Sequence, residues 1–291
     1  MSTATTMTRS DFRFFDRLRV RWAEIDAQNI VFNGHYLMYF DTAVAGYWRA
    51  LALPYAQTME QLGGDMFVRK ATVEYLASAR YDDVLDIGLR CGHIGNSSMR
   101  FDCAAFRQDE LLVTGELIYV FADPHSQTSQ PVPPALRAVF NDFEAGTSML
   151  DVQLGSWATL GVHAKAIRTE VFIDEQRIAA DLEWDEADPD ALHSVAFNRL
   201  GLPLATGRLL THAPGVARIG RMATRAILRG SNVGRAVLDA LVAAARARGD
   251  GEVLLNAQLT AQSFYARAGF RPYGSVFEEA GIPHIEMTMA L

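Results

Sequence analysis

The N-terminal half of the chain combines several strand-like patterns with a single long helical pattern. Residues 17–22 alternate charged and apolar side chains, as in a half-buried strand, whereas Leu37, Phe40 and Val44 recur at helical spacing. The predicted elements are a strand over 14–22, a helix over 34–51, and strands over 67–76, 84–91, 98–106 and 111–121. Loop signals such as Asp82-Asp83 and Gly95-Asn96 separate successive strands, as between antiparallel neighbours. One long helix laid against a mostly antiparallel sheet is an α+β layout.

The C-terminal half interleaves helices with strands, which predicts a mixed α/β domain. The predicted elements are helices over 164–172, 232–248 and 261–268, and strands over 194–198, 203–210, 216–224, 253–258 and 285–291. A polar, Pro-rich loop at 123–134 and a short helix at 135–143 precede this half. We place the boundary within 144–149, which divides the chain into domains of residues 1–145 and 146–291.

Composition agrees with two globular domains and excludes some classes of partner. The 291 residues equal about two domains of ~100–200 residues each, and 49% hydrophobic residues suffice for two cores. A net charge of −7 provides no general basic field for nucleic acid. Cys91 and Cys103 lie in predicted strands at a spacing that suits no metal site, as expected in a reducing compartment. Residues 1–10 lack a secretory h-region and no apolar run is long enough for a membrane span, so we expect a cytoplasmic protein without metal or membrane partners.

Charge is unevenly distributed in the C-terminal half. Residues 181–190 carry six acids and no base, and residues 218–235 carry five arginines and no acid. A charge run of this kind usually forms a solvated loop, which is the expectation for 181–190. The alternative is that the acids attract a cationic amine.

The first candidate site is a carboxylate before a helix. Asp26 follows the first strand, and the predicted helix opens seven residues later at about Asn33. The first turn of a helix offers unpaired N–H groups and a positive dipole end, which can polarise a thioester carbonyl. The carboxylate can attack that carbonyl or activate a water. The alternative is that Asp26 only stabilises the local turn, a common role for Asp.

The surrounding string resembles the hot-dog acyl-CoA thioesterases of the 4-hydroxybenzoyl-CoA thioesterase-like branch. The resemblance covers about residues 12–145 and includes Asp-x-x-x-x-Val-Phe-Asn-Gly-His-Tyr from Asp26 and Asp-Asp-Val-Leu at 82–85. It implies an antiparallel sheet around a central helix, Asp26 as nucleophile or general base, and the N–H of Asn33 as the group that binds the thioester oxygen. It also implies a homodimer or homotetramer. Asn29 replaces the family's usual Gly, and Asn is the non-Gly residue that best tolerates a left-handed backbone.

Other side chains near Asp26 have simpler interpretations. The aromatic stripe of the predicted helix is expected to be core, and Tyr36 is the member most suited to line the site; the stripe comprises Tyr36, Phe40, Tyr47 and Trp48. Glu24 would share a strand face with Asp26 if the strand continued that far. His35 lies two positions after the Asn33 position, where some family members carry His, so a mechanism on Asp26 alone is favoured.

The second candidate site is a small-residue turn between a strand and a helix. The stretch Arg229-Gly-Ser-Asn-Val-Gly-Arg precedes the helix over 232–248, an arrangement whose N–H groups can hold a pyrophosphate. It resembles the Arg/Gln-x-x-Gly-x-Gly/Ala turn of the GCN5-related N-acetyltransferases (GNAT), with Asn232 at the central Gly position. The resemblance implies that N–H groups of 232–235 bind the pyrophosphate of acetyl-CoA. The implied cofactor-binding residues are Met222, Thr224, Arg229, Gly230, Asn232, Val233, Gly234, Arg235 and Asn256.

The downstream segment extends this resemblance over about residues 150–291. Leu254-Leu-Asn-Ala-Gln-Leu-Thr-Ala-Gln-Ser-Phe-Tyr-Ala-Arg-Ala-Gly-Phe is similar to the GNAT strand and helix that end in Phe-Tyr-x-x-x-Gly-Phe, and Gly281-Ile-Pro-His is similar to ElaA-type acetyltransferases. The pattern implies that Tyr265 protonates the departing CoA thiolate; the alternative is a core tyrosine with a satisfied hydroxyl. The sequence offers four unranked candidates for the base that deprotonates the amine: Glu183, His193, Glu279 and His284.

Together the two resemblances predict a bifunctional enzyme. The first domain would hydrolyse acyl-CoA, and the second would transfer acetyl from acetyl-CoA to an amine, with the CoA thioesters as substrates and no permanently bound cofactor. The first domain should prefer longer or aromatic acyl groups, because hydrolysis of acetyl-CoA would drain its neighbour's donor. The alternative, motivated by the two Asn-for-Gly replacements, is that one domain is a non-catalytic CoA-binding module for regulation or assembly. A hot-dog hydratase is less favoured, because its Asp-to-His spacing is not evident.

Overall fold

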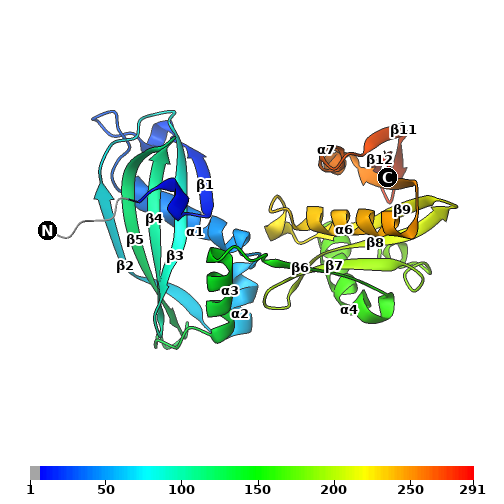
Figure 1. The fold of residues 1–291 in the computed structure, drawn as a ribbon, viewed down its shortest axis with the longest axis horizontal. Helices are drawn as coiled ribbons and strands as arrows, with labels where there is room; N and C mark the ends of the chain where they lie inside the picture. Colours follow the sequence, from blue (N-terminus) through cyan, green and yellow to red (C-terminus); the bar gives the residue numbers. More distant parts are fainter. Residues whose placement is uncertain (1–6) are drawn as a thin grey trace. The chain divides into compact units, whose positions relative to one another are not determined.

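The computed structural model describes residues 7–291, which form two compact units divided between Met149 and Leu150 (Figure 1). Each unit has its own sheet. In both, elements from distant parts of the sequence are neighbours. We describe the units separately.

The first unit is a five-stranded antiparallel sheet with the order β1-β3-β4-β5-β2. The strands are β1 (Phe14–Arg19), β2 (Asp65–Tyr75), β3 (Val84–Ile94), β4 (Ser98–Arg107) and β5 (Glu110–Ala122). The helices are α1 (His35–Ala50), α2 (Tyr55–Leu62) and α3 (Pro134–Glu144), with short 3-10 turns at Arg9–Asp11 and Trp22–Glu24. Helix α1 packs against β1, β2 and β3, so the expected hot-dog arrangement of a sheet around a central helix is confirmed (Figure 1).

Helix α1 is held by the aromatic stripe that the sequence places on its inner face. All four members, Tyr36, Phe40, Tyr47 and Trp48, are buried, which confirms their expected core role. The helix approaches the sheet closely at Gly115, where an added Cβ would lie 2.5 Å from the Phe40 ring. A larger residue at 115 would therefore push α1 from the sheet.

Two expectations for the first unit are wrong at the ends of its strands. The first strand stops at Arg19 instead of Trp22, because Trp22–Glu24 closes a 3-10 turn in which the N–H of Glu24 donates to the carbonyl of Arg21. The turn Asp82-Asp83 does not join paired strands: β2 pairs with β5, and β3 lies between β1 and β4. By contrast, β3 and β4 around Gly95-Asn96 are antiparallel neighbours, as expected. Helix α2 was not predicted.

The second unit is a seven-stranded sheet with the order β11-β12-β10-β9-β8-β7-β6. The strands are β6 (Leu150–Gly155), β7 (Leu192–Asn198), β8 (Pro203–Ala213), β9 (Val216–Thr224), β10 (Glu252–Gln258), β11 (Arg271–Glu279) and β12 (Ile282–Ala290). The helices are α4 (Trp157–Arg168), α5 (Ala180–Glu183), α6 (Val233–Arg248) and α7 (Gln262–Arg267). Only β9 and β10 pair in parallel, which makes the sheet mixed, as expected.

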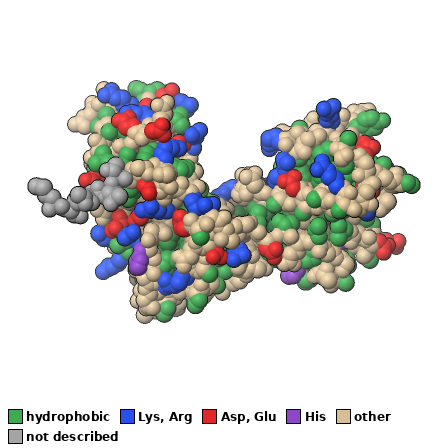
Figure 2. Space-filling model, in the orientation of Figure 1, with side chains coloured by type: hydrophobic (Ala, Val, Ile, Leu, Met, Phe, Trp, Pro, Cys, Tyr) green, Lys and Arg blue, Asp and Glu red, His purple; other side chains and the backbone are tan. Residues whose placement is uncertain are grey.

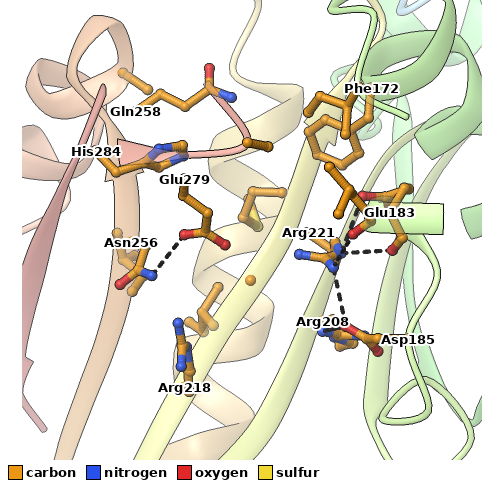
Figure 3. Close-up of a pocket in the computed structure, with 18 of the residues that line it drawn as sticks. Phe172, Glu183, Asp185, Arg208, Arg218, Arg221, Asn256, Gln258, Glu279 and His284 are labelled. Carbon is orange, nitrogen blue, oxygen red and sulfur yellow. Dashed lines mark hydrogen bonds and ion pairs between the residues drawn. The ribbon is translucent and has the colours of Figure 1, made fainter. Parts of the chain in front are cut away.

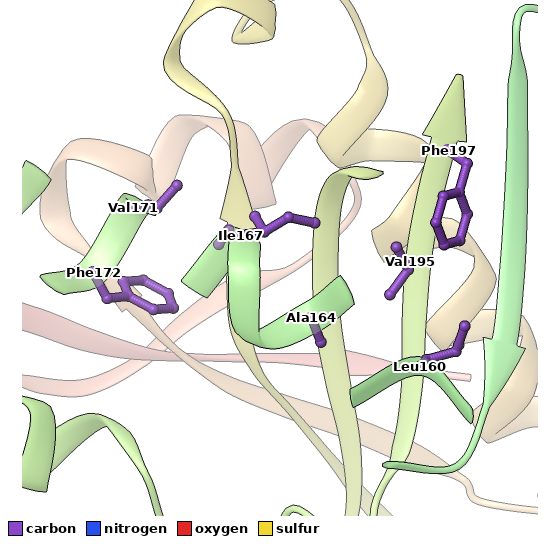
Figure 4. Packing of buried hydrophobic residues seen from close by; sticks show 8 residues of the cluster. Leu160, Ala164, Ile167, Val171, Phe172, Val195 and Phe197 are labelled. Carbon is purple, nitrogen blue, oxygen red and sulfur yellow. The ribbon is translucent and has the colours of Figure 1, made fainter. Parts of the chain in front are cut away.

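Helices α4 and α6 cover opposite faces of this sheet. Leu160, Ala164 and Ile167 of α4 pack with Val195 and Phe197 of β7 in one buried cluster (Figure 4). On the other face, Gly207 of β8 is so close to α6 that an added Cβ would lie 2.7 Å from Leu241. The contact at Gly207 fixes α6 against β8, the strand that pairs with β9 beside the candidate site.

The helix predicted over 164–172 needs correction, and two strands were not predicted. Helix α4 starts at Trp157, and the chain then continues as a π-helix over Thr169–Glu175. Strand β11 is exposed along its whole length, so it carries no buried alternating pattern. Strand β6, a short sheet edge, does alternate apolar and polar residues over 150–154 and could have been predicted.

Three features of the described chain bear on its partners: its surface charge, the apolar character of its helices and the arrangement of residue types that bind metals. Acidic and basic side chains are mixed over the visible face of each unit in Figure 2. Among residues 7–291, no helix is long and apolar enough to cross a membrane, and no group of His, Cys, Asp and Glu side chains is arranged to hold a metal ion.

Candidate active sites

Asp26 lies in a tight turn before helix α1. The turn is closed by a bridge between Ile25 and Val31, and the N–H of Asp26 donates to the carbonyl of Ile30 at 2.9 Å. Asn29 has a φ of +60°, so Asn makes the left-handed turn expected at this position. The carboxylate Oδ1 of Asp26 accepts a 2.8 Å hydrogen bond from the N–H of Gln28. Among residues 7–291 this is the carboxylate's only hydrogen bond, which leaves Oδ2 available.

Asn33 lies at the start of helix α1, as expected. The residue is exposed, and α1 begins two positions later at His35. The carbonyl of Asn33 accepts a 3.1 Å hydrogen bond from the hydroxyl of Tyr75 on β2, which fixes this end of the helix. The first N–H groups of a helix have no partner within it, so they can bind an oxyanion. No contact joins the Asp26 side chain to Asn33 within the described chain.

Glu24 does not belong to this site. Because the strand ends at Arg19, Glu24 does not share a strand face with Asp26, and its buried carboxylate accepts hydrogen bonds from Arg21 and from the hydroxyl of Tyr39. Tyr36 is also occupied, since its hydroxyl accepts the N–H of Ala79 at 3.1 Å.

Exposed aromatic side chains precede and follow the Asp26 turn in the sequence. Trp22 is 74% exposed and packs edge-to-face on Tyr81, with ring centroids 5.3 Å apart. Phe32, one residue before Asn33, is also exposed. These rings are therefore accessible from solvent.

The second candidate site begins at the turn before α6. Asn232 has a φ of +65° and Gly230 a φ of +83°, so Asn232 takes the backbone conformation for which the family uses Gly. Helix α6 starts directly after it, at Val233. An added Cβ on Gly234 would lie 2.7 Å from Oγ1 of Thr224, so Gly at this position lets the helix end approach β9. The first N–H groups of α6 are thus presented at a left-handed turn, the geometry that binds phosphate.

The two arginines of the turn are engaged by acids. Arg229 makes a bidentate ion pair with Glu175, with both N–O distances at 2.6 Å, and the pair holds the pKa of Glu175 below its usual range. Arg235 donates to Asp239 and to the carbonyl of Arg267. Arg229 must release Glu175 to make a bidentate pair with a phosphate, whereas Nη2 of Arg235 takes part in neither of that residue's two bonds.

A cavity of about 580 Å³ opens where β9 and β10 separate. The two strands pair only from Val216–Glu252 to Arg218–Leu254, and beyond these residues they diverge. Met222 of β9 and Asn256 of β10 line the cavity, while Thr224 lies at the end of β9 against Gly234. Figure 3 shows labelled side chains of β9, β10 and the β11–β12 hairpin around this space. The divergence leaves backbone groups on the facing edges of two strands free to bind an extended ligand.

Tyr265 of α7 also lines the cavity and is buried. Burial alone raises the pKa of its hydroxyl above the usual range, so the group keeps its proton. Its ring packs edge-to-face with Phe264 and Phe270. Tyr265 therefore has both a ring that packs in the core and a protonated hydroxyl at the wall of the cavity.

The geometry ranks the four candidate bases. His193 is excluded because it does not line the cavity: its Nε2 pairs with the carbonyl of Asp188, and its burial lowers its pKa. Glu183 is held by Arg168 and Arg221. Glu279 and His284 line the cavity, and Glu279 accepts a 3.0 Å hydrogen bond from Asn256.

His284 has the clearer geometry for a base. Its Nδ1 lies 2.7 Å from the carbonyl oxygen of Ile282, an acceptor, so in the neutral ring Nδ1 carries the hydrogen. Nε2 then holds a lone pair. Phe277 stacks on the ring and limits its rotation.

The acidic run 181–190 is solvated only in part: Asp181, Glu186 and Asp190 are exposed, as expected of a solvated loop, but two of the other acids are not. Glu183 and Asp188 are buried, and they form an ion cluster with Arg168, Arg208, Arg221 and Asp185. A hydrogen bond from Arg208 lowers the pKa of Asp185 to about 2. Burial alone would raise the pKa of Asp188, but hydrogen bonds from Arg168 and Arg208 hold it below its usual range. The acids therefore organise one wall of the cavity.

Sequence reasoning missed some residues that line the cavity. Period-two alternation with buried Ala217 predicts that Arg218 lies on the other face of β9, but it does not mark the cavity, which Ile219 also lines. Arg221 could not have been placed, because it sits in a bulge with a φ of +54°.

Comparisons with known proteins agree with this geometry in both units. Residues 28–114 match the family model described as Thioesterase superfamily, and residues 170–291 match the one described as Acetyltransferase (GNAT) domain. The second unit is 34% identical over 122 residues to the Uncharacterized N-acetyltransferase YjcF of Bacillus subtilis (strain 168), which covers 42% of this chain and 86% of that protein. The chain belongs to both families. We therefore call the units the thioesterase unit and the GNAT unit.

Two other relatives support this assignment. The GNAT unit is 34% identical over 125 residues to Protein ElaA of Escherichia coli (strain K12), over 42% of this chain and 81% of that protein, which confirms the ElaA-type resemblance. The thioesterase unit is 31% identical over 96 residues to a protein of Aquifex aeolicus (strain VF5) named "Putative esterase", over 33% of this chain and 74% of that protein. The chain is thus a fusion of two CoA-related domain families.

Proposed function

We propose that the protein is a bifunctional CoA-dependent enzyme. Residues 1–145 hydrolyse acyl-CoA thioesters, and residues 146–291 transfer acetyl from acetyl-CoA to an amine. The observation that carries the proposal is the pair of left-handed turns at Asn29 and Asn232, because each makes the backbone that its family builds with Gly. The replacements that favoured a non-catalytic CoA-binding module thus leave both turns in place.

Hydrolysis depends on Asp26. The free Oδ2 attacks the thioester carbonyl or takes a proton from a water that attacks it. When Asp26 attacks, its oxygen forms the C–O bond of an anhydride as the C–S bond breaks, and a water then hydrolyses the anhydride to the free acid and the Asp26 carboxylate. When a water attacks, its oxygen forms the C–O bond and Asp26 takes its proton as the C–S bond breaks. In both routes the thiolate leaves as CoA thiol with a proton that comes from the water. The N–H at Asn33 binds the oxyanion that forms on the carbonyl oxygen.

Transfer depends on His284 and Tyr265. Nε2 of His284 accepts the proton of the amine, whose nitrogen attacks the thioester carbon; a C–N bond forms and the C–S bond breaks. Tyr265, which keeps its proton because of burial, donates it to the thiolate. N–H groups of residues 232–235 bind the pyrophosphate, and Asn256 lies beside the pantetheine arm between β9 and β10.

The oligomer is proposed to form through the thioesterase unit. β2 pairs with β5 on one edge only, and its exposed side chains include Phe67, Val68 and Tyr75. A second copy that pairs with the other edge would cover these apolar groups in a twofold dimer.

Single substitutions separate the two activities. Asp26→Asn should lower acyl-CoA hydrolysis by at least about 100-fold, the usual effect of removing an acid–base group, and leave acetyl transfer unchanged. Tyr265→Phe should lower transfer about 10- to 100-fold and leave hydrolysis unchanged. Hydrolysis and transfer are measured in the same preparations by release of CoA with and without an amine. Asp109→Asn, an exposed exchange, is the control; undiminished hydrolysis in Asp26→Asn would remove Asp26 from this role.

A further inference from the structure

The GNAT cavity continues past the expected thioester position to a wall with a free arginine. Along β9, Thr224 lies at the phosphate-binding turn, Met222 follows in the cavity, and Arg218 lies four residues further from the turn than Met222. CoA binds with its pyrophosphate at the turn. The end of the cavity at Arg218 is therefore not filled by CoA and is open to the second substrate. The chemistry of that end therefore selects the acceptor.

Most charges at the cavity wall neutralise each other. The ion cluster of Arg168, Glu183, Asp185, Asp188, Arg208 and Arg221 contains as many acids as arginines, all joined by ion pairs. Its lining members therefore add no net charge to the cavity. They form a rigid polar wall.

Two charges that line the cavity lie outside this cluster. The guanidinium of Arg218 makes no ion pair or hydrogen bond with any residue of the described chain, although it is half-buried and lines the cavity. Glu279 has no cationic partner there, only the amide of Asn256. Figure 3 shows both side chains entering the same space, from β9 and from the end of β11. The cavity thus offers one unpaired cation and one unpaired anion.

The register of β10 gives the order of these groups. Arg218 is paired with Leu254, Glu279 is bound to Asn256, and His284 is paired with Gln258. Each step of two residues along a strand covers about 7 Å. Arg218, Glu279 and His284 are therefore met in sequence along one wall, with the base at the far end from the guanidinium.

We propose that the acetyl acceptor is a small zwitterionic amine, of the amino-acid class, whose carboxylate binds Arg218 and whose ammonium group binds Glu279 beside His284. This inference rests on the transferase activity proposed above and names its substrate class. The strand levels of Arg218 and His284 lie about 13 Å apart, so several atoms separate the carboxylate of the acceptor from its amine. One proton of the ammonium group passes through His284 to solvent, which leaves the neutral amine; its nitrogen gives a second proton to Nε2 of His284 as the C–N bond forms and the C–S bond breaks. Tyr265 protonates the thiolate and is reprotonated from solvent, so the products are the acetylated amine, CoA thiol and one released proton.

The kinetic test uses matched acceptors that differ only in the carboxylate. The pairs are glycine with methylamine, β-alanine with ethylamine, 4-aminobutyrate with propylamine, and 6-aminohexanoate with pentylamine, each with acetyl-CoA and the full chain. We expect one or more of the longer amino acids to exceed its partner amine in kcat/KM by about 10- to 100-fold, the usual value of a charge-assisted pair. Arg218→Gln should abolish this difference through the KM of the amino acid, and leave the KM of acetyl-CoA and of the amines unchanged.

Matched controls make the result specific. Arg246→Gln removes an exposed arginine of α6 that does not line the cavity and should change nothing, and Arg218→Lys should restore part of the preference. An equal kcat/KM for acids and amines in the wild-type protein would overturn the proposal. So would a rise in the KM of acetyl-CoA in Arg218→Gln without a change for the acceptor, since Arg218 would then serve CoA.

A binding measurement separates this inference from the transferase proposal. Saturation-transfer NMR of the same eight compounds in the presence of CoA detects the acceptor without any reaction. Amino-acid binding that Arg218→Gln removes and Arg246→Gln keeps supports the zwitterion site, even if no acetyl is transferred and the transferase proposal fails. Transfer to amines, together with amino-acid binding that is absent or unaffected by Arg218→Gln, overturns the site but keeps the transferase. If neither amino-acid binding nor acetyl transfer is observed, the zwitterion site and the transferase proposal are both overturned.

Discussion

Two asparagines occupy the backbone positions that decide whether each site can form. Asn29 and Asn232 have φ values of +60° and +65°, a region that costs most residues about 1–2 kcal/mol each. Asn pays less because its short side chain tolerates this region. The residue type therefore preserves the turn at a modest energetic cost, although the family pattern is broken at both positions.

The turn at Asn232 can be tested by substitutions that differ in how well they tolerate a left-handed backbone. Asn232→Gly should keep acetyl-CoA binding, whereas Asn232→Ala should destabilise the turn by about 1 kcal/mol and raise the KM of acetyl-CoA about fivefold. The measurement is transfer kinetics at a fixed amine concentration. Asn29→Ala is the matched control, because its left-handed turn lies in the thioesterase unit. An unchanged KM in Asn232→Ala would show that this turn does not bind CoA.

At the scale of elements, sequence patterns succeed where one face of an element is buried. Helix α1 and strand β9 carry clear periodicity because their inner side chains pack in a core. Strand β11 lacks such a signal since all its residues are exposed, and it is placed by its pairing with β12. The bulge at Arg221 also depends on pairing, with β8. These parts of the cavity arise from tertiary structure alone.

Tertiary structure likewise explains the error about the acidic run. Sequence shows six acids, but not that Arg168 and Arg208 meet Asp188 inside the unit. A run of acidic residues is expected to be exposed only if no buried cation pairs with it. Asp26 and Tyr265 could be selected from motifs. The candidate bases could be ranked only from the structure, because Glu279 and His284 are placed by the β11–β12 hairpin.

The ion cluster should determine the stability of the GNAT unit. Asp188→Asn leaves two buried arginines short of a carboxylate and should lower the free energy of unfolding of this unit by about 3–5 kcal/mol. Urea denaturation followed by the fluorescence of Trp157 and Trp184, which lie beside Arg168, reports the change. Asp190→Asn, an exposed exchange in the same run, should stay within about 0.5 kcal/mol. Equal effects of the two exchanges would contradict a structural role for the cluster.

At the scale of the whole molecule, assembly should depend on the edge of β2. Val68→Lys places a charge on the exposed apolar strand and should shift the protein from dimer to monomer in sedimentation velocity experiments. Val162→Lys, at a 73% exposed position of α4 in the GNAT unit, is the control. A dimer that persists in Val68→Lys would place the interface elsewhere.

The presence of two CoA-dependent units in one chain also constrains what the thioesterase unit can hydrolyse. Under the proposed division of activities acetyl-CoA is the donor of one unit, so we expect the other to spare it, and the exposed aromatics that flank Asp26 in the sequence are the groups we expect to select longer acyl chains. Each methylene of the acyl chain buried against Trp22, Tyr81 or Phe32 is worth about 0.8 kcal/mol, or about fourfold in kcat/KM.

Hydrolysis across a series from acetyl-CoA to decanoyl-CoA, with benzoyl-CoA as the aromatic member, should therefore rise steeply with chain length. Trp22→Ala should flatten the rise, and Asp26→Asn should remove hydrolysis at every length. Fastest turnover on acetyl-CoA would contradict the division of substrates. A second measurement follows from the same argument: with acetyl-CoA and an amine, wild-type protein and Asp26→Asn should give equal yields of acetylated product, because a thioesterase unit that ignores acetyl-CoA takes nothing from the transferase.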